Sequence, residues 1–196
     1  MADTPAPKPQ LSDAIFDLVL QVPSSQEQAL EQPAQRAHAI SRTAARNASL
    51  IASSLSLPPG FLGWLTVLPE LVGVWKLQAQ MVSDIAAVYG KQKTLGREQM
   101  LYCLFKHVSA QLFRDVVVRV GERVVVQQTS LKILQSVAQQ VGIKLTKTII
   151  SKSAARFVPL LGAVGVGAYA YFDTLQVAKT AVALFEQDLI IEEKSL

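Results

Sequence analysis

The 196-residue sequence has a single cysteine, Cys103, which excludes a disulfide within the chain. Residues 1–10 lack a basic stretch followed by an apolar core, so we expect no secretory signal peptide. These residues hold three prolines and little that a core could bury, which predicts a loose, disordered tail at 1–10 before a single helical domain at 11–196. We expect a protein of the reducing cytoplasm.

The sequence also lacks a long uninterrupted apolar run. Phe157–Phe172 is uncharged, but sixteen helical residues span only about 24 Å of the ~30 Å hydrocarbon core of a membrane. Leu57–Trp75 is longer, yet three prolines and Glu70 interrupt it. Only 17% of the chain is charged and 50% is hydrophobic, so these two segments are typical of interfacial, re-entrant or protein-buried elements.

Residues arranged as in a catalytic, metal or cofactor site are absent, and we therefore expect no enzymatic activity. Cys103 and His107 are four residues apart, but a metal site needs three or four ligands, and His38 lies in a different predicted helix. A cysteine nucleophile would need an orienting carboxylate beside His107, and Asp115 is two helical turns away.

Glycine is concentrated in the run from Pro159 to Ala168. The spacing Gly165-x-Gly167-x-x-Ala170 matches a dinucleotide-binding fingerprint, but that motif needs a preceding strand and a parallel sheet, which the surrounding pattern does not predict. Two interpretations remain open. The small residues allow a close approach either to a helix of another subunit or to a helix of the same core.

Hydrophobic periodicity predicts an all-α protein, a compact bundle whose apolar helices are broken by proline and glycine. Ser24 or Ser25 is expected to cap the second helix, Pro33 is a site for a bend in it, and Thr94 is expected to cap a later helix. The expected helical segments are Leu11–Val22, about 25–56, a turn at Phe61–Leu68, Pro69–Tyr89 ending at Gly90, Leu95–Phe113, Ser130–Arg156 with a break near Gly142, a glycine-bearing stretch opened by Pro159, and Asp173–Gln187.

The segment 116–126 permits two conformations. Its valines alternate around Gly121-Glu122, a pair suited to a tight turn, so a short β-hairpin is one of them. The spacing Leu112, Val116, Val120 and Val124 fits a helix as well, and the helical neighbours on both sides favour the helix.

Acidic residues are missing from two long stretches, 32–69 and 123–172, although both contain lysine or arginine. Each basic helix leads into one of the apolar, proline- and glycine-broken segments. A basic helix next to an apolar wedge suits an anionic membrane surface, which attracts each cation by about 1 kcal/mol. The expected wedge residues are Phe61, Trp64, Leu65, Pro159, Gly162, Gly165 and Gly167, and the expected basic face is Lys144, Lys147, Lys152 and Arg156.

Nucleic acid is the other natural partner of a basic stretch, but the net charge is only +4 and the cations are interrupted by Ile, Leu and Val. No zinc-ligand spacing or aromatic RNA-binding motif accompanies them. We therefore expect no nucleic-acid partner.

Two short motifs resemble the EcsC family of bacterial proteins. The first is Leu57-Pro58-Pro59-Gly60 followed by the run Leu71–Gly90, which contains Gln78, Asp84, Tyr89 and Gly90. The second is the run Val158–Gly165, a proline followed by small residues. The likeness covers about Gln32–Phe185 and implies a helical, membrane-associated protein with no established activity. The bulky, acidic Tyr169–Asp173 departs from the small, polar and then basic residues usual in the family at this point.

Taken together, these features predict a non-enzymatic helical protein, peripheral to the cytoplasmic face of the inner membrane. Its expected partner is an anionic membrane surface or an apolar protein. One alternative is a soluble module that self-associates as a homo-oligomer through Gly162–Gly167, and another is a carrier of a lipid-like apolar ligand in a pocket between the wedges.

Overall fold

Long helices make up most of the structure, a computed structural model that describes residues 11–55, 63–120, 123–152 and 159–194, with side chains at 11–53, 71–118, 124–147 and 165–187. The expected all-α bundle is confirmed. The elements are α1 Leu11–Leu20, α2 Pro33–Leu55, α3 Gly63–Val88, η1 Gln92–Thr94, α4 Arg97–Phe105, η2 Ala110–Phe113, β1 Val117–Val120, β2 Arg123–Val126, α5 Leu131–Lys152 and α6 Pro159–Lys194.

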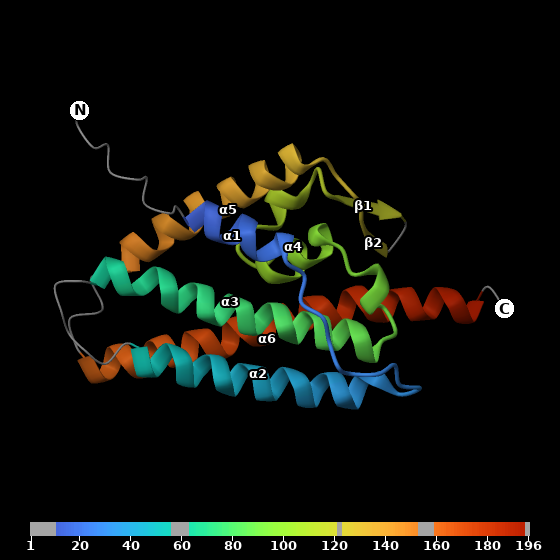
Figure 1. The fold of residues 1–196 in the computed structure, drawn as a ribbon, viewed down its shortest axis with the longest axis horizontal. Helices are drawn as coiled ribbons and strands as arrows, with labels where there is room; N and C mark the ends of the chain where they lie inside the picture. The colour runs from blue at the N-terminus through green and yellow to red at the C-terminus, as the bar shows by residue number, and fades with distance from the viewer. Residues whose placement is uncertain (1–10, 56–62, 121–122, 153–158, 195–196) are drawn as a thin grey trace.

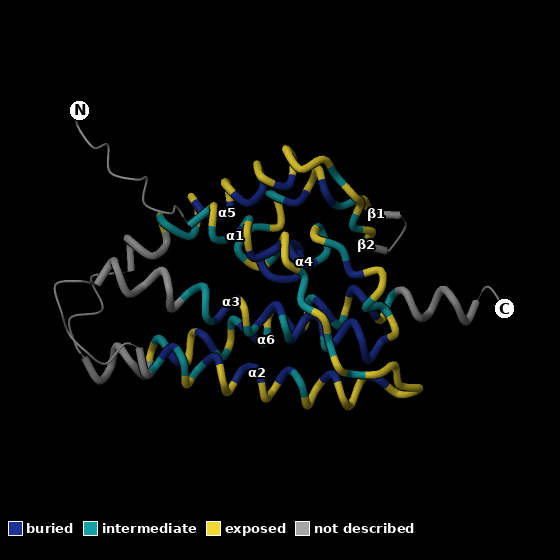
Figure 2. The backbone as a smooth tube through the Cα atoms, viewed as in Figure 1, coloured by how far each residue is buried: buried dark blue, intermediate teal, exposed yellow. Residues whose placement is uncertain are grey.

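The helices form two layers (Figure 1). Helices α2, α3 and α6 lie side by side along the long axis, with α2 antiparallel to the other two. Helices α1, α4 and α5 form the second layer, in which α1 packs on α5. Buried residues line the interface between the layers, and exposed residues follow the outer faces (Figure 2).

Alanines allow α2 to pack closely against α3 and α6. Ala37, Ala45 and Ala48 are completely buried, and small side chains let two helix backbones approach. Ala48 and Ala52 form a small second core with Val74 of α3 and Ala170 of α6. These alanines therefore form the packing face of α2.

Glycine 142 sits at the crossing of α5 and α1. A Cβ built on Gly142 would lie 2.9 Å from the backbone nitrogen of Ser12, so only glycine permits this approach. The expected break near Gly142 is wrong, because α5 continues through this position and uses it for close packing.

The preference for a helix at 116–126 is also wrong, and the hairpin alternative is confirmed. Strands β1 and β2 pair antiparallel, with Val117 opposite Val126 and Val120 opposite Arg123. Val117, Val124 and Val126 pack on the core, while Val118 and Val125 are exposed. This alternation has a period of two, which a helix could not present to one core.

Helix α2 begins at Pro33 instead of bending there. Proline suits a first helical position because its missing N–H would have no partner within the helix. Residues 21–32, here called the strap, are not helical and lie along α3. Ser25 accepts the N–H of Glu27 at 3.0 Å within the strap, so its predicted role as a helix cap is wrong.

Three other expected boundaries also differ. Helix α3 begins at Gly63 and continues through Pro69, helix α4 is restricted to Arg97–Phe105, and α6 joins the glycine-bearing stretch to the final helix. A helix tolerates a lost hydrogen bond or a helix-weakening glycine where tertiary packing stabilises its turns. Such packing is not visible in local sequence signals.

Candidate functional site

A polar cluster lies inside the core where α3, α6 and the end of α4 meet. Gln78 of α3 is completely buried, and its Nε2 donates to Asp173 Oδ2 at 2.8 Å and to Thr174 Oγ1 at 3.0 Å. His107, two residues after α4, places Nε2 2.7 Å from Asp173 Oδ1. The side chain of Asp173 is only 12% exposed, so Gln78 and His107 supply hydrogen-bonding contacts that water largely cannot.

An imidazole held by a carboxylate resembles the base of a nucleophilic site, but Cys103 does not provide the nucleophile. The Cys103 side chain is fully buried, and burial raises the pKa of its thiol to about 12. The thiol is therefore protonated at neutral pH, whereas attack requires the thiolate. The cluster ties α3, α4 and α6 together through a buried polar contact.

Asp173 is the member of this cluster that the sequence did not reveal, because only Asp115 was considered as the carboxylate for His107. Asp115 is exposed, whereas Asp173 lies far along the chain and contacts His107 directly. A signal was present. Asp173 is the first acid after a long acid-free stretch and lies in an apolar helix, where a carboxylate requires a partner.

Asp84 of α3 holds the strap. Its Oδ1 accepts hydrogen bonds from Ser25 Oγ at 2.6 Å and from Gln80 Nε2 at 2.9 Å. Gln80 also donates to the carbonyl of Ser24, and the N–H of Leu30 donates to the carbonyl of Val88. These contacts fix the connection between α1 and α2 on the surface of α3.

Gly90 ends α3 in the left-handed conformation, with φ of 70°. The N–H of Gly90 bonds the carbonyl of Ala87 at 2.8 Å, and the N–H of Lys91 bonds that of Ala86 at 2.7 Å. These two hydrogen bonds satisfy two carbonyls at the helix end, and the turn that forms them needs a residue that tolerates positive φ. The expected stop at Gly90 is confirmed.

The adjacent Tyr89 is 3% exposed, and its hydroxyl has no hydrogen-bond partner among the described residues. Burial, with a smaller contribution from the charge of Glu186, raises the pKa of Tyr89 above its ordinary value. Tyr89 therefore acts as a buried ring beside the Gly90 turn.

The described ends of four helices lie at one end of the long axis, at the left of Figure 1. Helices α2 and α5 finish there, and α3 and α6 begin there; we call this region the wedge end. Among the expected wedge residues, Trp64 and Leu65 lie in the first turns of α3, and Pro159 and Gly162 in the first turns of α6. Phe61 lies outside the described residues, and so do the side chains of Trp64, Leu65 and Pro159.

The two other wedge glycines differ in their surroundings. A Cβ on Gly167 would meet the hydroxyls of Ser49 and Ser53, so Gly167 packs against α2 of the same chain. Gly165 is exposed, and a Cβ there would meet no atom within 4 Å. For Gly167 the close approach is therefore internal.

Of the expected basic face, Lys144 and Lys147 are exposed on α5. Lys152 ends α5 with its side chain outside the described set, and Arg156 lies outside the described residues. Arg42 and Arg46, four residues apart, are exposed on α2. Arg36 differs from them because it pairs with Glu27 at 2.7 Å, a contact that lowers the pKa of Glu27.

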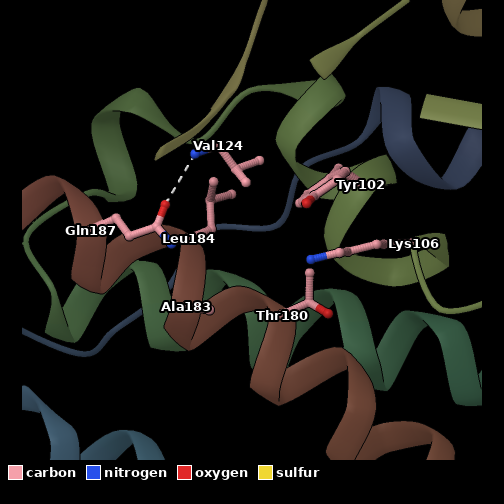
Figure 3. A pocket seen from close by; sticks show the side chains of 7 residues that line it. All are labelled: Tyr102, Lys106, Val124, Thr180, Ala183, Leu184 and Gln187. Atoms are coloured by element: carbon pink, nitrogen blue, oxygen red, sulfur yellow. Dashed lines mark hydrogen bonds between the residues drawn. The ribbon is translucent and has the colours of Figure 1, made fainter. Parts of the chain in front are cut away.

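A small depression lies between α4, β2 and α6 (Figure 3). Its volume is about 20 Å³, which is room for about one water molecule. Lys106 extends between Tyr102 and Thr180, with Nζ 5.1 Å from the centre of the Tyr102 ring. The lining residues are Tyr102, Lys106, Val124, Thr180, Ala183, Leu184 and Gln187.

In a comparison with known families, the model of the EcsC protein family matches the chain over residues 8–187. The chain belongs to the EcsC protein family. No curated protein and no solved structure matches the chain.

In this EcsC protein, the four residues singled out in the first motif, Gln78, Asp84, Tyr89 and Gly90, lie on α3 or directly after it, whereas the described part of the second motif opens α6. Gln78 bonds α6, Asp84 bonds the strap, and Tyr89 and Gly90 form the terminus of the helix. The motif thus has a structural explanation as the set of contacts that α3 makes with its neighbours.

No helix in the described part of this EcsC protein has a segment both long and apolar enough to cross a membrane. Likewise, the described residues contain no group of three or more histidine, cysteine, aspartate or glutamate side chains that could hold a metal ion.

Proposed function

We propose that this EcsC protein is a non-enzymatic helical protein that attaches peripherally to the cytoplasmic face of the inner membrane through the wedge end. One observation carries the proposal. The two acid-free stretches, 32–69 and 123–172, are far apart in sequence, yet the described helices within them reach the same end of the molecule (Figure 1).

Charge supports this proposal. Arg42 and Arg46 are exposed on α2, and Lys144 and Lys147 on α5. Neither α2 nor α5 contains an acidic residue, so the charged side chains of each helix are all basic. A cation near an anionic bilayer contributes about 1 kcal/mol, so several of them together give measurable attraction.

Exposed apolar side chains support it as well. Leu50 of α2 is 68% exposed, and Tyr169 and Phe172 of α6 are 55% and 65% exposed. All three lie in the halves of α2 and α6 that lead to the wedge end. Aromatic residues are favourable at the boundary between lipid and water, where part of the ring is covered and part remains hydrated.

The direct test is co-sedimentation of the full chain with phosphatidylcholine vesicles prepared with and without phosphatidylglycerol. We expect binding only to the anionic vesicles at low salt, and its loss near 1 M salt, where the screening length falls to about 3 Å. Failure to sediment with anionic vesicles at low salt would show that the proposal is wrong.

A pair of charge variants tests the location of the surface. Replacing Arg46 and Lys147, which are exposed in the halves of α2 and α5 that lead to the wedge end, by glutamine should weaken vesicle binding roughly 30-fold, since two cations contribute about 2 kcal/mol. The matched control replaces Lys93 and Arg97, which are exposed and follow α3 in the chain; α3 ends opposite the wedge end (Figure 1). Equal loss from both pairs would indicate nonspecific attraction to net charge.

The exposed Leu50 and Phe172 favour a second candidate, contact between the wedge end and an apolar protein partner. The vesicle experiment separates the two. A protein that ignores both vesicle types, and whose Phe172→Ser variant loses a co-purifying protein, would favour the second candidate.

A further inference from the structure

At the outer edge of strand β1, the backbone groups of Val117 have no hydrogen-bond partner among the described residues. The register identifies them. The N–H of Gln127 bonds the carbonyl of Val116 at 2.9 Å, so Val116 and Gln127 form a hydrogen-bonded pair. Hydrogen-bonded and non-hydrogen-bonded pairs alternate along an antiparallel hairpin, so the next pair, Val117 and Val126, is not hydrogen-bonded. Val117 and Arg119 therefore direct their backbone groups away from β2.

The two edges of the hairpin differ in whether a described residue bonds their outward backbone groups. On the β2 side, the outward N–H of Val124 donates to Gln187 Oε1 of α6 at 3.2 Å, so α6 covers that edge (Figure 3). On the β1 side, Val117 makes no such bond with any described residue. Proteins ordinarily protect an open strand edge with lysine, proline or a covering segment, because an open edge pairs readily with another strand. Strand β1, Val-Val-Arg-Val, has no lysine or proline, and Arg119 is its one charged residue.

The exposed face of the hairpin is apolar beside this open edge. Val118 and Val125 are cross-strand neighbours, exposed by 40% and 43%, and they point away from the core-packed Val117, Val124 and Val126. A strand added next to β1 would extend the sheet and place its own side chains beside Val118.

We propose that this edge binds β1 of a second copy of the chain, which gives a homodimer with a continuous four-stranded antiparallel sheet. A two-fold axis at Val118 pairs residue 117 of one copy with residue 119 of the other, so all outward groups of both strands are used. This register places valine beside valine and arginine opposite valine, and no like charges are directly opposed. The strand is thus complementary to itself.

The dimer surface is separate from the membrane surface proposed above. The hairpin lies away from the wedge end along the long axis (Figure 1), so both contacts are compatible in one molecule. The dimer is tested in solution without lipid, and its presence or absence leaves the vesicle result unaffected.

Sedimentation velocity of the full chain over a range of concentrations provides the first test. We expect a monomer–dimer equilibrium for the native chain and at least tenfold weaker dimerisation for Val118→Glu, which places two carboxylates opposite each other across the axis. Mixing Val118→Glu with Val118→Lys should restore the dimer. The matched control is Val125→Glu, since Val125 is equally exposed but one strand further from the axis.

Crosslinking tests the register. In the Val118→Cys variant the two thiols lie directly opposite each other and should form an intermolecular disulfide under mild oxidation, whereas Val125→Cys should not. The native Cys103 does not interfere because it is fully buried. A native chain that remains monomeric at every concentration, or a dimer that Val118→Glu and Val125→Glu weaken equally, would overturn the proposal.

Discussion

Asp173 connects three helices because its two carboxylate oxygens have different partners. One oxygen accepts from Gln78 of α3, and the other faces His107 beyond α4, while the residue itself belongs to α6. Each partner compensates part of the cost of placing a carboxylate where it is only 12% exposed. Removing any one of the three groups leaves the others with unmet hydrogen-bonding capacity in the core.

We expect Asp173→Asn to lower the free energy of unfolding by about 2 kcal/mol, because one partner of a mostly buried pair is lost. Urea denaturation measures the change. Asp115→Asn is the control, since Asp115 is exposed and should change stability by no more than about 0.5 kcal/mol. Equal effects of the two substitutions would contradict the role of the cluster.

Cys103 leads to a prediction about pH. Burial raises the pKa of its thiol from 9.0 to about 12, so the unfolded chain loses this proton at a lower pH than the folded chain does. The folded state then binds more protons, and stability falls as pH rises from about 9 towards 12. Chemical unfolding across this range should show a shallower decline for Cys103→Ala.

The same burial predicts that iodoacetamide at pH 8 modifies Cys103 only after the protein unfolds. Rapid modification of the folded chain would show that the thiol is accessible and ionised, contrary to the structure.

At the scale of elements, two helical glycines differ in the space around them. Gly142 of α5 faces the backbone of α1, whereas a Cβ on Gly73 of α3 would meet nothing within 4 Å. Alanine is favoured over glycine inside a helix by about 0.8–1 kcal/mol when space is available. The crossing of α5 and α1 removes that space at Gly142.

We therefore expect Gly142→Ala to destabilise the protein by roughly 1–2 kcal/mol, because the methyl group must push two helices apart. Gly73→Ala should stabilise it by about 0.8 kcal/mol, and it serves as the matched control. Thermal or urea unfolding compares the two variants. A stabilising Gly142→Ala would mean that α1 does not approach α5 this closely.

At the scale of the whole molecule, the two tryptophans report on different regions. Trp75 is 5% exposed and packs edge-on against Phe105, with ring centres 5.3 Å apart. Trp64 lies in the first turns of α3, at the wedge end. One residue therefore monitors the core and the other the proposed membrane surface.

For the proposed membrane attachment, we expect anionic vesicles to shift the fluorescence of the Trp75→Phe variant, which retains Trp64, to shorter wavelength. Lipids brominated on their acyl chains should quench it. The Trp64→Phe variant, which retains the buried Trp75, should show neither change. A shift in both variants would indicate a general rearrangement, and a shift in neither would argue against insertion of the wedge end.

Local sequence signals were sufficient for several features. The period of the apolar residues predicted the helical class, and Gly90 marked the end of α3 because glycine tolerates the positive φ found there. The missing acids in 32–69 and 123–172 were also visible directly. Each of these depends either on neighbouring residues or on the composition of one continuous stretch, so a linear sequence contains the whole signal.

Other features depended on which surfaces meet in the folded chain. The spacing in 116–126 suited both a helix and a hairpin, and packing of Val117, Val124 and Val126 on the core selected the hairpin. The partner of His107 is Asp173 because α6 passes beside α4, and Gly167 is needed because α2 lies against it. Such contacts join residues that are far apart in the chain, and only the tertiary structure brings them within bonding distance.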